Sequence, residues 1–87
     1  MATRVVTIAN PQGLHARPAA LFSTEAQRFS SDIWVRNITT DGDFVDAKSV
    51  MAVLGIDFSM GDGAELEAEG DDAQNALDAL VTLIEEL

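Results

Sequence analysis

Cysteine is absent from this chain of 87 residues, and histidine occurs only once. Without thiols the fold holds no disulfide and no thiolate metal site, which favours a reducing compartment. A single histidine also argues against a His-rich zinc site. The aspartates that tempt a metal hypothesis fit no calcium-loop spacing; they are Asp57, Asp62, Asp71 and Asp72. We therefore expect neither a metal nor a cofactor.

Long hydrophobic runs are missing too. No segment approaches the ~20 apolar residues that a membrane-spanning helix needs, and the N-terminal residues lack the layout of a signal peptide. These absences predict a soluble protein of the cytoplasm with no membrane insertion. Hydrophobic residues still make up 47% of the chain, enough for a globular core. A chain of this length predicts one domain over residues 1–87.

Positive charge is scarce. Five Lys and Arg residues stand against 15 Asp and Glu residues, so the net charge is −10. Four of the five basic residues lie in residues 1–40, whereas residues 41–87 hold Lys48 alone against thirteen acids. Nothing supplies the basic stripe that nucleic-acid phosphates require, so no nucleic-acid partner is expected. The acidic half is interpreted as a solvated face that aids solubility.

Turn signals divide the chain into seven elements. β-branched or alternating segments predict strands over residues 4–9, 33–38, 43–47 and 64–69. Apolar residues at helical spacing predict helices over residues 16–29, 50–54 and 73–87. Asp41-Gly42 predicts a hairpin turn between the second and third strands. The order β-α-β-β-α-β-α predicts an α+β domain, with helices on one face of an antiparallel sheet.

The single histidine lies where a turn leads into a helix. Gly13 permits a tight turn before His15, and Pro18 suits the first turn of a helix. A helix start leaves backbone N–H groups free and carries the positive end of the macrodipole, so it stabilises an anion. Arg17 adds a guanidinium that suits phosphate. A neutral imidazole can attack phosphorus, so His15 is the candidate nucleophile of a phosphoryl transfer.

Gly13-Leu14-His15-Ala16-Arg17-Pro18-Ala19 resembles the signature of HPr, the histidine-containing phosphocarrier of the phosphoenolpyruvate-dependent sugar phosphotransferase system. Residues 48–54 are similar to the family's second signature, and the resemblance extends over essentially the whole chain. It implies an open-faced β-sandwich, in which three helices cover a four-stranded antiparallel sheet. It also implies a phosphocarrier rather than an enzyme that turns over a small molecule by itself.

The resemblance implies residue roles and partners as well. His15 would accept a phosphoryl group on Nδ1 from enzyme I and pass it to IIA domains, with Arg17 assisting the transfer. The backbone N–H groups of Ala16 and Arg17 would lie near the phosphoryl oxygens. The partners would dock on an apolar patch beside the histidine, and the carrier would act as a monomer. We define this docking patch by its four residues: Ala20, Val50, Met51 and Leu54.

Ser49 admits two interpretations. It directly precedes the short predicted helix and suits the N-cap position, where its hydroxyl accepts a free helix N–H. The resemblance also matches Ser49 to a regulatory serine that HPr kinase/phosphorylase modifies in some bacteria. A phosphate there would add about −1.5 to −2 of charge next to the docking patch.

Three other functions stay open. Val35-Arg36-Asn37 and the acidic C-terminal half also resemble NPr, the carrier of the nitrogen-related phosphotransferase system. A regulatory docking module would work through Ser49 and the docking patch and would need no phosphoryl transfer. A small-molecule-binding domain of ferredoxin-like type fits the β-α-β-β-α-β order but leaves Gly13–Pro18 unexplained.

Overall fold

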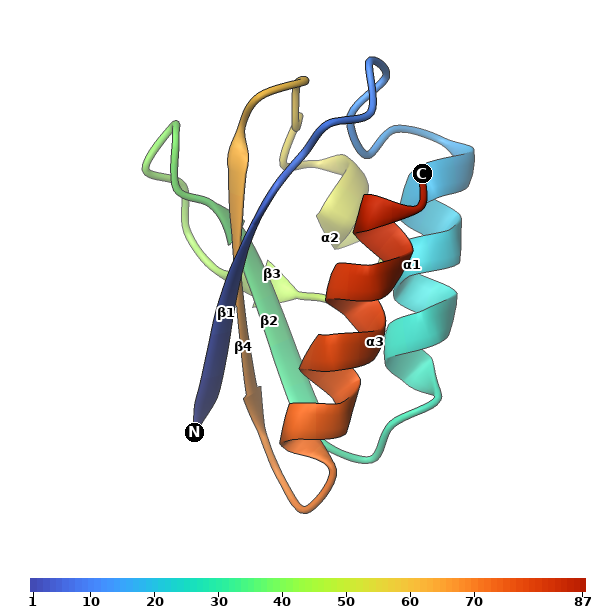
Figure 1. Ribbon diagram of the computed structural model, residues 1–87, viewed down its shortest axis with the longest axis vertical. Helices are drawn as coiled ribbons and strands as arrows, with labels where there is room; N and C mark the ends of the chain where they lie inside the picture. Colours follow the sequence, from blue (N-terminus) through green and yellow to red (C-terminus); the bar gives the residue numbers. More distant parts are fainter.

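The computed structural model describes all 87 residues and has the predicted order of elements. The strands are β1 (Ala2–Thr7), β2 (Asp32–Asn37), β3 (Val45–Asp46) and β4 (Gly63–Glu69). The helices are α1 (Arg17–Gln27), α2 (Val50–Leu54) and α3 (Ala73–Glu85). All strand pairs are antiparallel, in the order β1-β4-β2-β3. The helices lie on one side of this sheet (Figure 1), which confirms the predicted open-faced sandwich.

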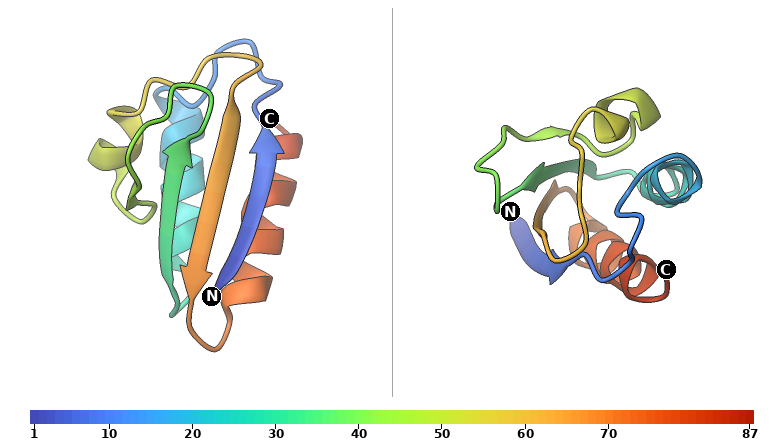
Figure 2. Two further views of the ribbon diagram at one scale, coloured as in Figure 1. Left: turned by 90° about the vertical axis from the view of Figure 1, so that its left-hand side faces the viewer. Right: turned by 90° about the horizontal axis from the view of Figure 1, so that it is seen from above.

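The core lies between the sheet and the helices. Strands β2 and β4 alternate buried and less buried residues, so every second side chain, such as Val35 and Leu66, points inward. Helix α3 packs on β1 and β4 and also against α1, and from α1 the core receives Phe22. Figure 2 shows the two long helices side by side behind the sheet, whose other face is open. No helix is both long and apolar enough to cross a membrane.

Several predicted boundaries were wrong. β1 covers Ala2–Thr7 instead of residues 4–9, because its first residue, Ala2, already pairs with Ala68 on β4. Helix α1 ends two residues before the predicted Phe29, and α3 ends at Glu85, which leaves Leu87 37% exposed beyond the helix.

The third strand is the largest departure. It was predicted over residues 43–47 and spans only Val45–Asp46. The cause is Asn37, a buried residue whose side-chain oxygen accepts the N–H groups of Thr39 (2.9 Å) and Thr40 (3.2 Å). These bonds turn the chain away from the sheet directly after β2. The Asp41-Gly42 turn is therefore not flanked by long paired strands, and β3 stays short.

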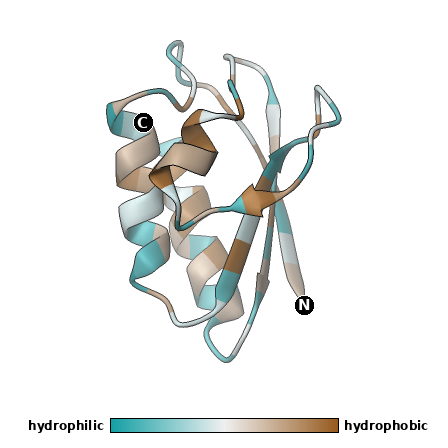
Figure 3. Cartoon of the chain, turned by 180° about the vertical axis from the view of Figure 1, so that it is seen from behind, coloured by the Kyte–Doolittle hydropathy of each residue, from teal (hydrophilic) through white to brown (hydrophobic).

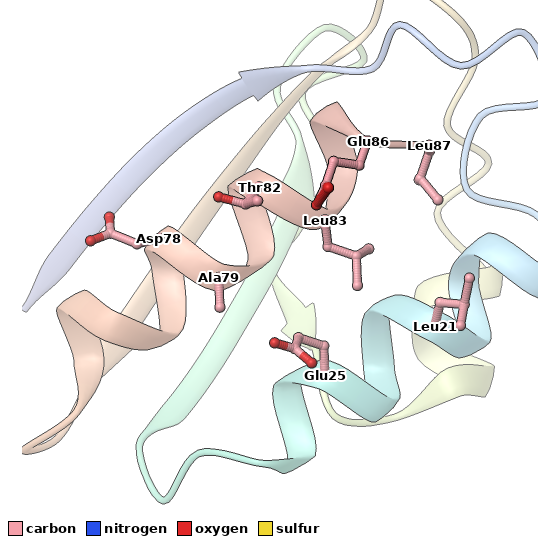
Figure 4. Close-up of a pocket in the computed structure, with 8 residues that line it drawn as sticks. All are labelled: Leu21, Glu25, Asp78, Ala79, Thr82, Leu83, Glu86 and Leu87. Carbon is pink, nitrogen blue, oxygen red and sulfur yellow. The ribbon is translucent and has the colours of Figure 1, made fainter.

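The surface has a shallow groove between α1 and α3 (Figure 4). Side chains from both helices and from the C-terminal residues line it: Leu21, Glu25, Asp78, Ala79, Thr82, Leu83, Glu86 and Leu87. None of the residues predicted for the phosphoryl site or the docking patch contributes to this groove. The predicted site therefore lies elsewhere on the surface.

Candidate functional site

His15 belongs to a loop that is bonded to a second loop at the same end of the sheet. Residues 8–16 connect β1 with α1, and residues 55–62 connect α2 with β4 (Figure 1). The N–H of Ile8 donates to the carbonyl of Asp62 (2.8 Å), and the N–H of Gly61 donates to the carbonyl of Ile8 (2.6 Å). The two loops therefore form one connected unit around the histidine.

Gly13 brings these loops into direct contact. Its φ of 62° lies in the left-handed region, and a Cβ at this position would overlap the carbonyl group of the buried Phe58. The Gly13 N–H donates to the carbonyl of Asn10 (2.9 Å), and the Asn10 side-chain amide donates back to the carbonyl of Gly13 (3.1 Å). Only glycine fits here, and it fixes the chain two residues before His15.

Helix α1 begins without a side-chain cap. Its N-cap is Ala16, with φ 47° and ψ −114°, whose carbonyl accepts the N–H of Ala20 (3.1 Å) but whose methyl group can accept nothing. The N–H groups of Ala16 and Arg17 donate to no backbone or side-chain acceptor. Pro18 has no N–H to offer. This helix start therefore presents two free donors and the positive end of the macrodipole to an anion.

Arg17 is the one basic side chain without a partner. The others each bind an oxygen within 3 Å: Arg4 on Asp78 (2.7 Å), Arg28 on Glu25 (2.9 Å), Arg36 on Glu65 (2.7 Å) and Lys48 on the Phe29 carbonyl (2.8 Å). Arg17 is exposed and enters no ion pair or hydrogen bond. Its guanidinium, two residues after His15, is free to bind a phosphoryl group.

The imidazole itself is 48% exposed and has one charged neighbour that sequence reasoning missed. Nε2 of His15 lies 3.4 Å from Oδ1 of Asp57, a side chain that is 87% exposed. In the sequence, Asp57 stands out only among the aspartates that suggest a metal site. No spacing rule could join it to His15, because the contact depends on how the two loops fold together.

The docking patch is divided between surface and core. Its members lie on α1 and α2, which pack against each other. Ala20 is exposed and Met51 is 78% exposed, whereas Val50 and Leu54 are half-buried. Leu54 also packs against the hydrophobic core. Figure 3 shows α2 largely in the brown shades of hydrophobic residues, and of these residues Met51 is the one that is exposed at the surface.

Ser49 caps α2 as predicted. Its hydroxyl oxygen accepts the N–H of Ala52 at 3.2 Å, and its backbone is extended. The start of α2 is therefore closed by a side chain of the chain itself, unlike the start of α1.

Two aspartates have structural tasks. Asp62 accepts hydrogen bonds from the Ser59 N–H (2.9 Å) and the Asn37 amide (2.9 Å), which hold the pKa of Asp62 below its ordinary value. Hydrogen bonds from the Ser31 hydroxyl and then the Ser30 N–H lower the pKa of Asp72 to about 2. No group of three or more His, Asp or Glu side chains is arranged to hold a metal ion.

Comparison with known proteins agrees with this geometry. A family model described as the PTS HPr component phosphorylation site matches residues 2–86. The chain is 44% identical to a multiphosphoryl transfer protein of Vibrio cholerae over 90% of its own length, and it spans 20% of that longer protein. It is 41% identical to the HPr-like protein Crh of Halalkalibacterium halodurans over 98% of each chain.

Solved structures share the fold. A crystal structure of HPr-C-His from Thermoanaerobacter tengcongensis has a TM-score of 0.91 and 48% identity, and the match covers 99% of this chain and 93% of that one. A structure described as an HPr dimer from the same organism has a TM-score of 0.75. Fold and site thus define a small phosphoryl-carrying domain. The chain belongs to the HPr family of phosphocarriers, and it is a carrier protein rather than an enzyme.

Proposed function

We propose that this carrier accepts a phosphoryl group on Nδ1 of His15 from phosphorylated enzyme I and passes it to a IIA domain of the sugar phosphotransferase system. The observation that supports this most is the open start of α1. There an exposed imidazole is followed by two unbonded N–H groups and by the unpaired guanidinium of Arg17. Nδ1 is the ring nitrogen that does not face Asp57.

The transfer needs little from the protein beyond position and charge. The lone pair of Nδ1 forms a bond to phosphorus while the bond from phosphorus to the donor's nitrogen breaks. Negative charge spreads over the three equatorial oxygens during this step. The N–H groups of Ala16 and Arg17, together with the Arg17 guanidinium, stabilise that charge, because none of them is bound to another group of the chain.

The partners dock next to this site. Ala20 and Met51 offer the exposed apolar surface of the docking patch, and Val50 and Leu54 lie half-buried at its edge. Methionine adapts its shape to different partners, which suits a carrier that meets a donor and an acceptor in turn. Replacing Met51 by Glu should weaken transfer from enzyme I while leaving the fold intact.

The proposed working form is a cytoplasmic monomer. The dimer described for the Thermoanaerobacter HPr makes the oligomeric state a point to test. Size-exclusion chromatography with light scattering should give the mass of one chain over a wide range of protein concentration. A mass of two chains at low concentration would contradict the proposal.

The carrier function is tested with phosphoenolpyruvate and a bacterial enzyme I, followed by intact-mass spectrometry. The wild type should gain one acid-labile phosphoryl group, and the His15→Ala variant none. An adduct that forms only with the nitrogen-related enzyme I would assign the chain to the NPr branch. No adduct with either donor would contradict the phosphocarrier function for these systems.

A regulatory docking module, controlled at Ser49 by HPr kinase/phosphorylase, is the second candidate. The similarity to HPr-like Crh proteins favours it. A docking module keeps its partner binding in the His15→Ala variant, whereas a carrier loses its function entirely. Incubation with the kinase and ATP, with Ser49→Ala as the control, tests whether Ser49 accepts a phosphate.

A further inference from the structure

Asp57 is the one acidic side chain within ion-pair distance of His15. The 3.4 Å between Nε2 and Oδ1 lies within ion-pair range and is slightly long for a hydrogen bond. Hydrogen bonds of catalytic groups are often long before the reaction partner binds and shorten when it does. The contact is therefore positioned to form during transfer.

The backbone at Asp57 is constrained by its neighbours. Phe58, the residue after Asp57, is fully buried, and its carbonyl group faces the position where Gly13 lacks a Cβ. Asp57 has a φ of 42°, a left-handed conformation that aspartate tolerates better than most residues. Ala16, directly after His15, has a φ of 47°. Such conformations persist only where the surroundings fix them, and they gather at functional sites.

We propose that Asp57 is a positioning residue, which holds the proton of His15 on Nε2 and so keeps the reactive lone pair on Nδ1. This inference rests on the proposed phosphoryl transfer. When Nδ1 binds phosphorus, the ring becomes a cation that still carries its proton on Nε2, next to the Asp57 carboxylate. When the bond between Nδ1 and phosphorus breaks, the electron pair returns to Nδ1 and the ring leaves as neutral imidazole. No proton has to move in either direction.

Three variants isolate the carboxylate from the backbone. Asp57→Asn keeps the shape and removes the charge, and Asp57→Gly removes the side chain in a conformation that glycine adopts freely. Asp41→Asn is the matched control, because Asp41 also has a positive φ (55°) and an exposed carboxylate, which pairs with Arg36 at 3.5 Å. If Asp57 acted only through its backbone conformation, both Asp57 variants would keep the His15 tautomer and the phosphoryl lifetime of the wild type.

The first measurement is the tautomer of His15, read from its ring ¹⁵N chemical shifts at about pH 8.5, where an ordinary imidazole is neutral. The wild type and the Asp41→Asn variant should carry the proton on Nε2. Both Asp57 variants should show a larger share of the tautomer with the proton on Nδ1. This measurement needs no phosphoryl donor.

The second measurement is the lifetime of the phosphorylated protein at pH 8, after removal of enzyme I and phosphoenolpyruvate. Without the carboxylate, the proton on Nε2 is held less firmly and the ring is a poorer leaving group. The phosphoryl group should therefore survive about two- to fivefold longer in both Asp57 variants, as expected for an exposed ion pair. The difference should disappear at 1 M salt, where charges are screened beyond about 3 Å.

The proposal requires both effects. Unchanged tautomers, unchanged lifetimes or equal changes in the Asp41→Asn control would each overturn it. If the wild type takes up no phosphoryl group at all, the proposed function fails instead. The tautomer measurement still separates the two failures, because it reports the contact between Asp57 and His15 directly.

Discussion

The starts of α1 and α2 are built in opposite ways, although both helices belong to the same small domain. At α2, the Ser49 hydroxyl accepts the Ala52 N–H and closes the helix end. At α1, the N-cap is Ala16, whose side chain can accept nothing, and the N–H groups of Ala16 and Arg17 have no partner. The start of α2 is therefore capped by a side chain, and the start of α1 is not.

This difference shows how the fold prepares a site for an anion. An uncapped helix start is about 1 kcal/mol less stable than a capped one, so the open end of α1 is a local loss in stability. In the proposed transfer, the same free N–H groups bind phosphoryl oxygens. Helix α3 is a third case, in which the N-cap residue Asp72 directs its carboxylate to Ser30 and Ser31 instead.

The largest effect is expected from Gly13→Ala, which would disturb the open end of α1 by displacing its loop. The new methyl group would overlap the Phe58 carbonyl, and the alanine would have to adopt a left-handed backbone conformation. The free energy of unfolding should therefore fall by about 2–4 kcal/mol. Phosphoryl acceptance should fall with it, because His15 moves. Urea unfolding measures the loss of stability, and intact-mass spectrometry measures the loss of phosphoryl acceptance. Gly61→Ala is the control: Gly61 has open space around its Cβ position, so only the backbone contribution remains.

Removing the Arg17 guanidinium tests how much its charge contributes at the open start of α1. Arg17→Gln should slow phosphoryl acceptance about tenfold, less than is typical of an enclosed site because Arg17 is exposed to solvent. Arg28→Gln is the matched control on the same helix, since Arg28 is already bound to Glu25. Stopped-flow or quench measurements with enzyme I give the rates. Equal slowing in both variants would assign the effect to overall charge and not to the site.

Removing the Ser49 cap tests how much the closed start of α2 contributes to stability. Ser49→Ala should lower the unfolding free energy by about 1 kcal/mol, or the melting temperature by about 4–8 °C. The rate of phosphoryl acceptance at His15 should stay unchanged. Ser59→Ala is the control, because the Ser59 hydroxyl forms no hydrogen bond. A loss of the same size in both variants would show that the capping bond contributes nothing.

The start of α3 is tested by the pH dependence of stability. The folded state lowers the pKa of Asp72 to about 2, below its ordinary value of 3.8, so it favours the carboxylate form. The resulting stabilisation is present above about pH 4 and is lost as the pH falls toward 2. The stability difference between wild type and Asp72→Asn should therefore shrink as the pH falls from 7 to 2. A stability difference between wild type and Asp72→Asn that stays constant from pH 7 to pH 2 would contradict this expectation.

The sequence was informative where structure depends on neighbours along the chain. The order of elements follows from local periodicity, and the N-cap at Ser49 follows from its place directly before an apolar segment. The proposed phosphoryl site could be identified as a candidate for the same reason, because Gly13, His15, Arg17 and Pro18 lie within one turn and one helix start.

Features that depend on tertiary contact could not be predicted. The proximity of Asp57 to His15 requires two loops from different halves of the chain to fold together. The freedom of Arg17 becomes visible only when every other cation is found with a partner. The shortening of β3 depends on where the side chain of Asn37 places its oxygen, which neither its residue type nor its position reveals.

The proposed transfer places the phosphoryl group on His15 at the open start of α1. Amide and ring NMR shifts of ¹⁵N-labelled protein, recorded before and after phosphorylation, test it most directly. We expect phosphorus coupling at Nδ1 of His15 and the largest amide shift changes at Ala16 and Arg17, with little change at Ala52. An adduct that leaves the Ala16 and Arg17 amides unmoved, or that forms equally in His15→Ala, would contradict the claim.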